Sequence, residues 1–186
     1  MCKTIPGTTI EYKESGSMFA MFRPLIKATD GLTLSQVCAI TELEPSTIQN
    51  WVKRGFVSRP VNKKYRERQL ARILLISSLR DSMKIDSIGE LMSTVNGDAN
   101  DTGDDIISEE QMYDYLCEII KLAGGEVIKP AEIPGAVAMV TKDYIPPSEG
   151  ASKRLNDALT VMVYAYLSAQ LKQQAESLFM QIKENL

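Results

Sequence analysis

The hydrophobic residues between positions 34 and 95 recur at the three- and four-residue spacing of amphipathic helices. This spacing predicts four helices, over residues 34–41, 46–54, 69–83 and 85–95. The second helix has two distinct sides, and Ile48 and Trp51 lie on the apolar one, where we expect Trp51 to pack in the core. Its other side carries Thr47, Gln49, Asn50, Lys53 and Arg54. A short helix with such a polar side is suited to docking on a partner molecule.

Helix-capping signals join the first two helices into one unit. Thr33 and Gln36 form a Thr-x-x-Gln capping box, and Ser46 and Gln49 repeat the signature as Ser-x-x-Gln. Only residues 42–45 remain between the two helices. Two short helices joined by about four residues match the helix-turn-helix arrangement, whose second helix enters the major groove of DNA.

A short basic segment follows the second helix. Gly55 is placed to end that helix. Residues 58–66 are rich in Lys and Arg and contain Pro60 and Asn62, which predicts a small β-hairpin, or wing. Residues 31–95 are therefore predicted to form one unit, a helix-turn-helix with a β wing and two further helices.

The two ends of the chain are predicted to be helical as well. Residues 1–30 should form an N-terminal extension that packs on the core of the 31–95 unit through an apolar helix near Pro24. Residues 108–186 should form a C-terminal helical region, in which residues 126–150 form an extended connection, with a short strand or helical turn near Val137 as the alternative. The fold class is thus mainly α, with a small β wing.

The predicted helix over residues 151–183 is the longest in the chain. Its apolar stripe of about thirty residues is longer than a small helical unit needs. Part of it could pair with a second copy of the chain, or all of it could pack on the helix over residues 108–123 and on the N-terminal extension. We favour a homodimer.

Charge is strongly polarised along the chain, although the formal net charge is only −3. Residues 46–84 hold ten basic and two acidic side chains, a local charge of +8. Residues 85–118 hold ten acidic side chains and no basic one, a local charge of −10. A basic surface next to a helix-turn-helix favours a nucleic acid as the partner.

The amino-acid composition excludes several catalytic mechanisms and argues against disulfide and zinc sites. The chain of 186 residues contains no histidine, so no Ser-His, Cys-His or His-ligated metal mechanism is open to it. Its three cysteines are scattered and suggest neither a disulfide framework nor a zinc site. No apolar run approaches the roughly 20 residues that cross a bilayer. We expect a cytoplasmic protein that is not an enzyme and has no catalytic residue, metal or cofactor.

The acidic segment over residues 96–107 allows two interpretations. Asp98, Asn100, Gly103 and Glu109 fall at four positions of an EF-hand calcium loop. Thr102 and Asp105 do not fit that loop, and Glu109 suits the first turn of the next helix, which Ser108 and Gln111 would cap. A solvated acidic linker is therefore favoured over a calcium site.

A DNA interface can be assigned residue by residue. Arg59, Lys63, Lys64 and Arg66 on the wing would neutralise phosphates, and Gln49, Asn50, Lys53 and Arg54 would face base edges. Ser46, Thr47 and Tyr65 complete the predicted set. The competing interpretation is an ordinary solvated basic surface, with Gln49 used to close its capping box.

Residues 34–92 resemble the winged helix-turn-helix of MerR-type bacterial regulators. Thr47-Ile48, Gly55-Phe56 and Asn62-Lys63-Lys64-Tyr65 lie where that family has Thr-Leu, Gly-Leu and its wing motif. Gln49-Asn50-Trp51 replaces the family's Arg-Tyr-Tyr, and Glu42 stands at a turn position that usually holds glycine. The whole chain also resembles a bacterial family of unknown function with a MerR-like N-terminal half.

The MerR resemblance implies a dimer that binds a pseudo-palindromic promoter in double-stranded DNA and controls transcription. No residue pattern identifies a small-molecule effector. We therefore predict a sequence-specific DNA-binding regulator. The alternative is a protein-interaction module that keeps the helix-turn-helix fold without specific DNA binding. Salt-dependent DNA affinity would distinguish the two.

Overall fold

The protein is mainly helical, with a single small sheet among the residues that the structure describes. The structure is a computed structural model that describes residues 4–11, 17–123 and 129–184. Short 3-10 turns lie at η1 (Phe19–Met21) and η2 (Pro130–Glu132). The other elements in chain order are α1 (Arg23–Thr29), β1 (Leu32–Thr33), α2 (Leu34–Thr41), α3 (Pro45–Lys53), β2 (Lys64–Tyr65), α4 (Glu67–Leu79), α5 (Ile85–Asn96), α6 (Glu109–Ala123), α7 (Ile133–Val140) and α8 (Ala151–Glu184).

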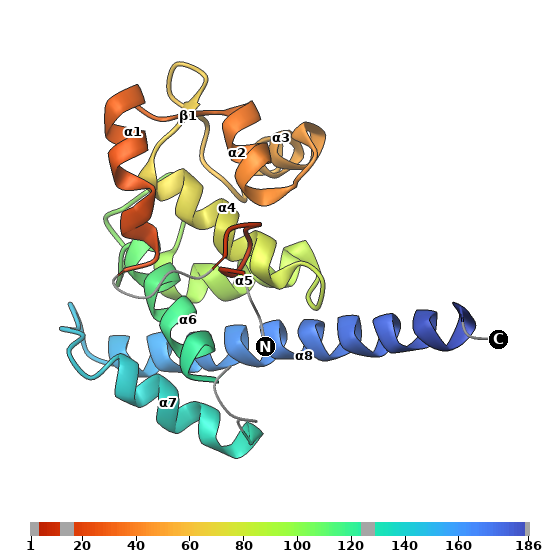
Figure 1. The fold of residues 1–186 in the computed structure, drawn as a ribbon. Coiled ribbons are helices and arrows are strands. Elements are labelled where there is room, and N and C mark those ends of the chain that lie inside the picture. The colour runs from red at the N-terminus through yellow and green to blue at the C-terminus, as the bar shows by residue number, and fades with distance from the viewer. Residues whose placement is uncertain (1–3, 12–16, 124–128, 185–186) are drawn as a thin grey trace.

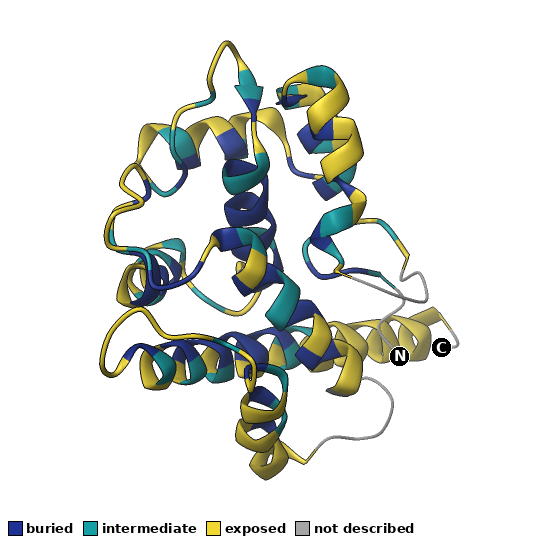
Figure 2. Ribbon diagram, turned by 90° about the vertical axis from the view of Figure 1, so that its left-hand side faces the viewer, coloured by how far each residue is buried: buried dark blue, intermediate teal, exposed yellow. Residues whose placement is uncertain are grey.

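Helix α4 is the centre of the core. Ten of its thirteen residues are buried, because α2, α5, α6 and α8 all pack against it. Figure 1 shows α1, α2 and α3 on one side of α4 and α6, α7 and α8 on the other. In the view of Figure 2 the buried residues run through α4 and along the adjoining part of α8. One core therefore connects the predicted 31–95 unit with the C-terminal helices.

The first two helices of the predicted unit form where the sequence indicated. Thr33 caps α2, and the capping box with Gln36 is complete, so this prediction is confirmed. Glu42 ends α2 in the left-handed conformation, with φ of 53°. The predicted capping box of Ser46 is wrong, because α3 already begins at Pro45 with Glu44 as its N-cap. Ser46 is thus inside the first turn, and the helix starts on a proline, whose missing N–H is no loss there.

The basic segment forms the predicted hairpin. Val61 and Lys64 exchange two backbone hydrogen bonds, of 3.0 and 2.9 Å, around Asn62 and Lys63. Both turn residues have positive φ, 51° and 63°, as a two-residue type I′ turn requires. Strand β2 also pairs antiparallel with β1, which sets Leu32 opposite Tyr65. The β1 pairing fixes the hairpin to the start of α2.

The connection after α6 differs from its prediction. Residues 133–140 form helix α7, which is longer than the helical turn allowed near Val137 in the predicted extended connection, and Pro134 lies in its first turn, where proline is tolerated. Ile133 and Val137, one turn apart, are buried, and α7 packs on α6 and α8. The helix predicted over residues 108–123 is followed in the sequence by Gly124 and Gly125, which lie outside the described residues. No helix that the structure describes is long and apolar enough to cross a membrane.

The N-terminal extension packs more widely than predicted. Phe19 is fully buried and stacks edge-on against the ring of Tyr113 of α6, with centroids 6.3 Å apart. The Tyr113 hydroxyl donates a 2.7 Å hydrogen bond to the carbonyl of Pro6. Gly7 approaches α4 so closely that a Cβ there would lie 2.4 Å from the Leu74 carbonyl oxygen. The extension therefore contacts the C-terminal region as well as the 31–95 unit.

Candidate nucleic-acid interface

Helix α3 has one buried side and one free side. Ile48 is fully buried and Trp51 is 5% exposed, which confirms the predicted packing role of Trp51. Thr47 is half-buried, and the predicted contact residues Ser46, Gln49, Asn50 and Lys53 are exposed. Within the described part of the chain, the side chains of Gln49, Asn50 and Lys53 make no hydrogen bond or ion pair. These three groups are available to a partner.

The basic segment over residues 58–66 presents two further cations at the end of the molecule where α3 lies. Arg59 and Lys63 are exposed, and the structure gives neither side chain an ion pair among the residues it describes. The hairpin lies beside α2 and α3 at one end of the molecule in both ribbon views (Figures 1 and 2). Gln69 donates a 2.7 Å hydrogen bond to the Arg59 carbonyl and so ties the start of this segment to α4.

Tyr65 cannot take part in the interface, so this predicted contact is wrong. Its side chain is 3% exposed and belongs to the core. Successive residues of a strand point to opposite faces, so the burial of Tyr65 directs Lys64 the other way. Burial also raises the pKa of the Tyr65 hydroxyl. Lys64 is half-buried and its ammonium group donates to the Thr29 carbonyl.

Two of the predicted contact arginines are held by acids of the same chain. Arg54 forms a 2.5 Å ion pair with Asp86 of α5 and lies 4.7 Å from the centroid of the Phe56 ring. Arg66 pairs with Asp30 at 3.1 Å. Both arginines keep substantial solvent exposure, so each could exchange its partner for a phosphate, at the cost of the existing pair.

Two arginines of α4 contribute nothing to a basic surface. The guanidinium of Arg72 pairs with the carboxylate of Glu109, and both side chains are almost completely buried, 4% and 0% exposed. Arg72 Nε also donates a 2.6 Å hydrogen bond to the carbonyl of Phe56, just beyond α3. Arg68 pairs with Asp105 at 3.2 Å. Part of the local charge of +8 is therefore neutralised by acids of the same chain.

The acidic segment supplies the partners of Arg54, Arg68 and Arg72, whereas Arg66 pairs with Asp30. Asp86, Asp105 and Glu109 all come from the stretch of charge −10, so the two oppositely charged segments neutralise each other across the fold. These acids were not predicted as partners from the sequence. The only signal was that a strongly acidic stretch directly follows a strongly basic one, which favours contact between them but not a particular pairing.

The segment over residues 96–107 is less solvated than predicted. Ile106 and Ile107 are buried, which anchors its end on the core. Asp98 accepts a 2.8 Å hydrogen bond from the Asn100 backbone N–H, as in an Asx-turn. Because the Glu109 carboxylate is turned inward to Arg72, it is not presented to a calcium ion as in an EF-hand. Among the described residues, no three Cys, Asp or Glu side chains are grouped so that they could hold a metal ion.

Asp105 gives the molecule a pH-dependent contribution to stability. Its side chain is 13% exposed, and burial raises the pKa of Asp105 to about 6, against the opposing charge of Arg68. Because this pKa lies above that of the unfolded chain, the contribution is full below about pH 4 and is lost as the pH rises through about 6. The loss should be on the order of 2 kcal/mol.

We expect Asp105→Asn to flatten the dependence of unfolding free energy on pH between about 4 and 7. Urea denaturation across this range measures it. Asp143→Asn, at an exposed position beyond α7, is the matched control and should keep the wild-type profile. An Asp105→Asn profile parallel to that of the wild type would show that Asp105 does not titrate in this range.

Most of these elements lie in a stretch of the chain that is similar to one family of proteins. Residues 28–116 match the family model of the Domain of unknown function (DUF1836). The DUF1836 match runs from the end of α1 into α6, so it includes α3, the hairpin and both members of the Arg72–Glu109 pair. It therefore extends past the end of the predicted 31–95 unit.

One curated relative is also similar. It is the "Uncharacterized protein YkrK" of Bacillus subtilis (strain 168), 29% identical over 91 residues. The match covers 47% of this chain and 39% of the relative's length. No solved structure matches. Similarity to a family of unknown function is thus found over residues 28–116, whereas the expectation covered the whole chain, and neither match carries a MerR assignment.

Proposed function

We propose that this protein is a DNA-binding transcriptional regulator in which α2 and α3 form a helix-turn-helix and the hairpin over residues 61–64 is its wing. The observation that carries the proposal is the free side of α3. Ile48 and Trp51 fix the helix to the core, while Gln49, Asn50 and Lys53 are exposed and unpaired within the described chain. A recognition helix needs this combination of a fixed orientation and free hydrogen-bonding groups.

The types of side chain on α3 suit base edges. Gln and Asn can form paired hydrogen bonds with adenine, and Lys can donate to guanine. Each well-formed paired contact discriminates between bases by about 1–3 kcal/mol. These contacts would come from the middle and end of a nine-residue helix, which is short enough to lie within the major groove.

The wing would supply contacts to the phosphate backbone. Arg59 and Lys63 are exposed cations on a segment that two sets of backbone hydrogen bonds, within the hairpin and to β1, hold in place. Together with Lys53 they give the proposed interface three exposed cations that have no ion-pair partner among the described residues. Phosphate contacts of this kind set the register of a protein on DNA without reading its sequence. The location we propose for this activity is the cytoplasm of a bacterium.

The proposal predicts DNA binding that depends on these three cations. Fragments of genomic DNA from the source organism would be captured with the purified protein, and the best fragment titrated at several salt concentrations. We expect an enriched sequence whose affinity falls steeply with salt. The triple variant K53A/R59A/K63A should bind far more weakly, and the slope of log K against log salt should fall by about 0.9 for each phosphate that the variant no longer neutralises.

A matched control separates local contacts from overall charge. The variant K121A/K129A/K142A removes the same charge from exposed positions on α6, near η2 and beyond α7, and should keep wild-type affinity and slope. If no sequence is enriched, or both triple variants bind alike, the regulator proposal fails. The alternative, a protein-interaction module, then becomes the better account. It is favoured by the internal pairing of Arg54, Arg66, Arg68 and Arg72.

A further inference from the structure

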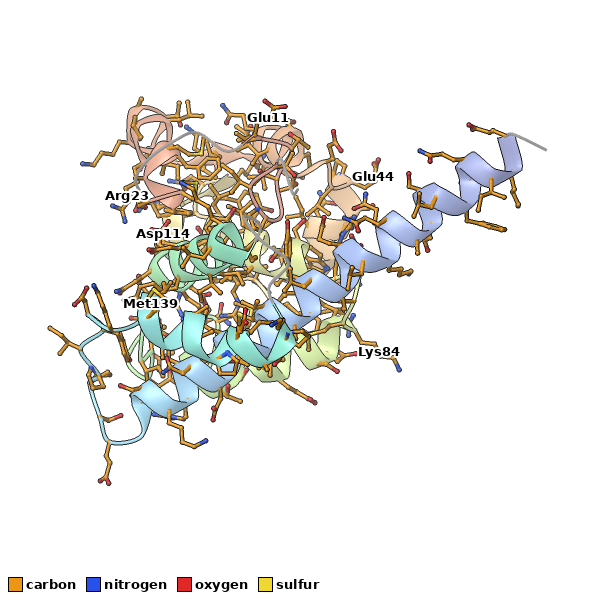
Figure 3. The ribbon with its side chains drawn as sticks, turned by 60° about the horizontal axis from the view of Figure 1, so that its bottom comes forward. Glu11, Arg23, Glu44, Lys84, Asp114 and Met139 are labelled. Carbon is orange, nitrogen blue, oxygen red and sulfur yellow. The ribbon has the colours of Figure 1, made fainter. Side chains whose placement is uncertain are left out.

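Helix α8 has two halves with different surroundings. Its first half packs on α5, α6 and α7, and Leu155, Leu159, Met162 and Tyr166 are buried there. From Leu171 to Glu184 every residue is exposed. Figures 1 and 3 show this second half projecting beyond the rest of the molecule, with no other described element along it. We call this second half, residues 171–184, the arm. A helix of this length that is surrounded by water is only marginally stable on its own.

The apolar residues of the arm do not continue the core-facing side. At 100° per residue, Leu171 lies nine positions after Met162 and therefore on the opposite side of the helix. Val161 and Tyr164 already occupy that opposite side within the packed half, and each is 41% exposed. The core-facing side continues into Gln170, Gln173, Ser177 and Glu184, with Met180 as its large apolar residue. The arm is thus not built to pack on its own core.

The opposite side has the spacing of a coiled-coil seam. Its positions alternate in steps of three and four over about 32 Å of helix. We call this set the outer seam, and it consists of Val161, Tyr164, Ser168, Leu171, Ala175, Leu178 and Ile182. Leu171 is 67% exposed, Leu178 60% and Ile182 58%. Such a row of exposed large apolar side chains requires a covering surface.

We propose that the outer seam is covered by the outer seam of a second copy of this chain, in a two-stranded coiled coil. The seam's heptad spacing is self-complementary, because the knobs of one helix fit the holes of an identical one. Charge does not oppose the pairing. Residues 167–184 contain two lysines and two glutamates and are neutral. Among the positions that flank the seam within this segment, only Lys172 is charged.

The surface is independent of the proposed DNA interface. The outer seam belongs to α8, whereas α3 and the hairpin lie on the opposite side of α4 (Figure 1). Pairing through α8 therefore leaves both free for DNA. It would also give a complex with two copies of α3, as a two-fold symmetric DNA site requires. Measuring association without DNA keeps this inference separate from the proposed function.

The test is the mass of the full chain in solution. Light scattering after size-exclusion chromatography, at micromolar concentration and without DNA, should give twice the 20.7 kDa of one chain. The variant L171E/L178E places four glutamates in the paired seam and should give the monomer mass while keeping a cooperative circular dichroism melting transition of the core, because both positions are exposed.

The matched control carries the same two charges on the opposite side of the same arm. Q173E/S177E should remain a dimer. A monomeric wild type would overturn the proposal, and would mean that another protein or a different segment covers the seam. A dimer that L171E/L178E does not dissociate would also overturn it, because the two chains would then associate through another surface.

Discussion

Arg72→Met should lower the free energy of unfolding by about 3–5 kcal/mol, because it leaves the Glu109 carboxylate buried without its countercharge. The methionine keeps most of the volume of the arginine stem, so the loss reports the charge and not a cavity. Glu109→Leu should cost a similar amount by leaving the guanidinium unpaired. Urea denaturation monitored by circular dichroism measures both.

The double variant R72M/E109L completes the cycle. It removes both charges and should be much more stable than the sum of the two losses implies, although the Phe56 carbonyl still loses its donor. The exposed pair of Lys153 and Asp157 on α8 is the control, and Lys153→Met should change stability far less. Additive losses in the double variant would mean that Arg72 and Glu109 do not interact in the folded protein.

Phe19→Ala should destabilise the protein by about 3–5 kcal/mol, the usual cost of removing a buried aromatic ring. The ring packs between Phe22 and Tyr113, so its loss leaves a cavity between the N-terminal extension and α6. The backbone N–H of Phe19 also donates a 2.8 Å hydrogen bond to Asp114, which the substitution retains. Thermal and urea denaturation provide the measurement.

Leu25→Ala is the matched control for this prediction. Leu25 lies on α1 in the same extension but is 44% exposed, so its truncation should have a small effect. Similar effects of the two substitutions would show that the Phe19 ring contributes no more to the core than an exposed side chain does. The Phe19→Ala result therefore decides whether a shortened chain without the extension can be expected to fold.

The helices around the proposed interface were predictable because local signals agree there. For α2 the capping box of Thr33 and the spacing of Val37 and Thr41 specify both start and face. The hairpin was predictable for the same reason, since Asn62 is a residue that tolerates positive φ. Periodicity also predicted the length of α8, from Ala151 to about Glu184.

Features that depend on distant contacts were not predictable. Helix α7 contains Pro134 and Gly135, which locally disfavour a helix, and it is stabilised by the burial of Ile133 and Val137 against α6 and α8. Tyr65 looked like an interface residue until its pairing with β1 placed it in the core. The free cations could not be separated from the paired ones by sequence, because pairing depends on which acids the fold brings near.

The central position of α4 has a consequence for how the protein is made. The residues that bury α4 lie far along the chain: Glu109 neutralises Arg72, and α8 covers the helix from residue 151 onward. While the ribosome has synthesised only the first hundred residues, α4 lacks these partners and its apolar face is uncovered. We therefore expect the α2–α3 unit to reach its final stability only when nearly the whole chain has emerged, so that folding is slow relative to local helix formation and exposed to aggregation during synthesis.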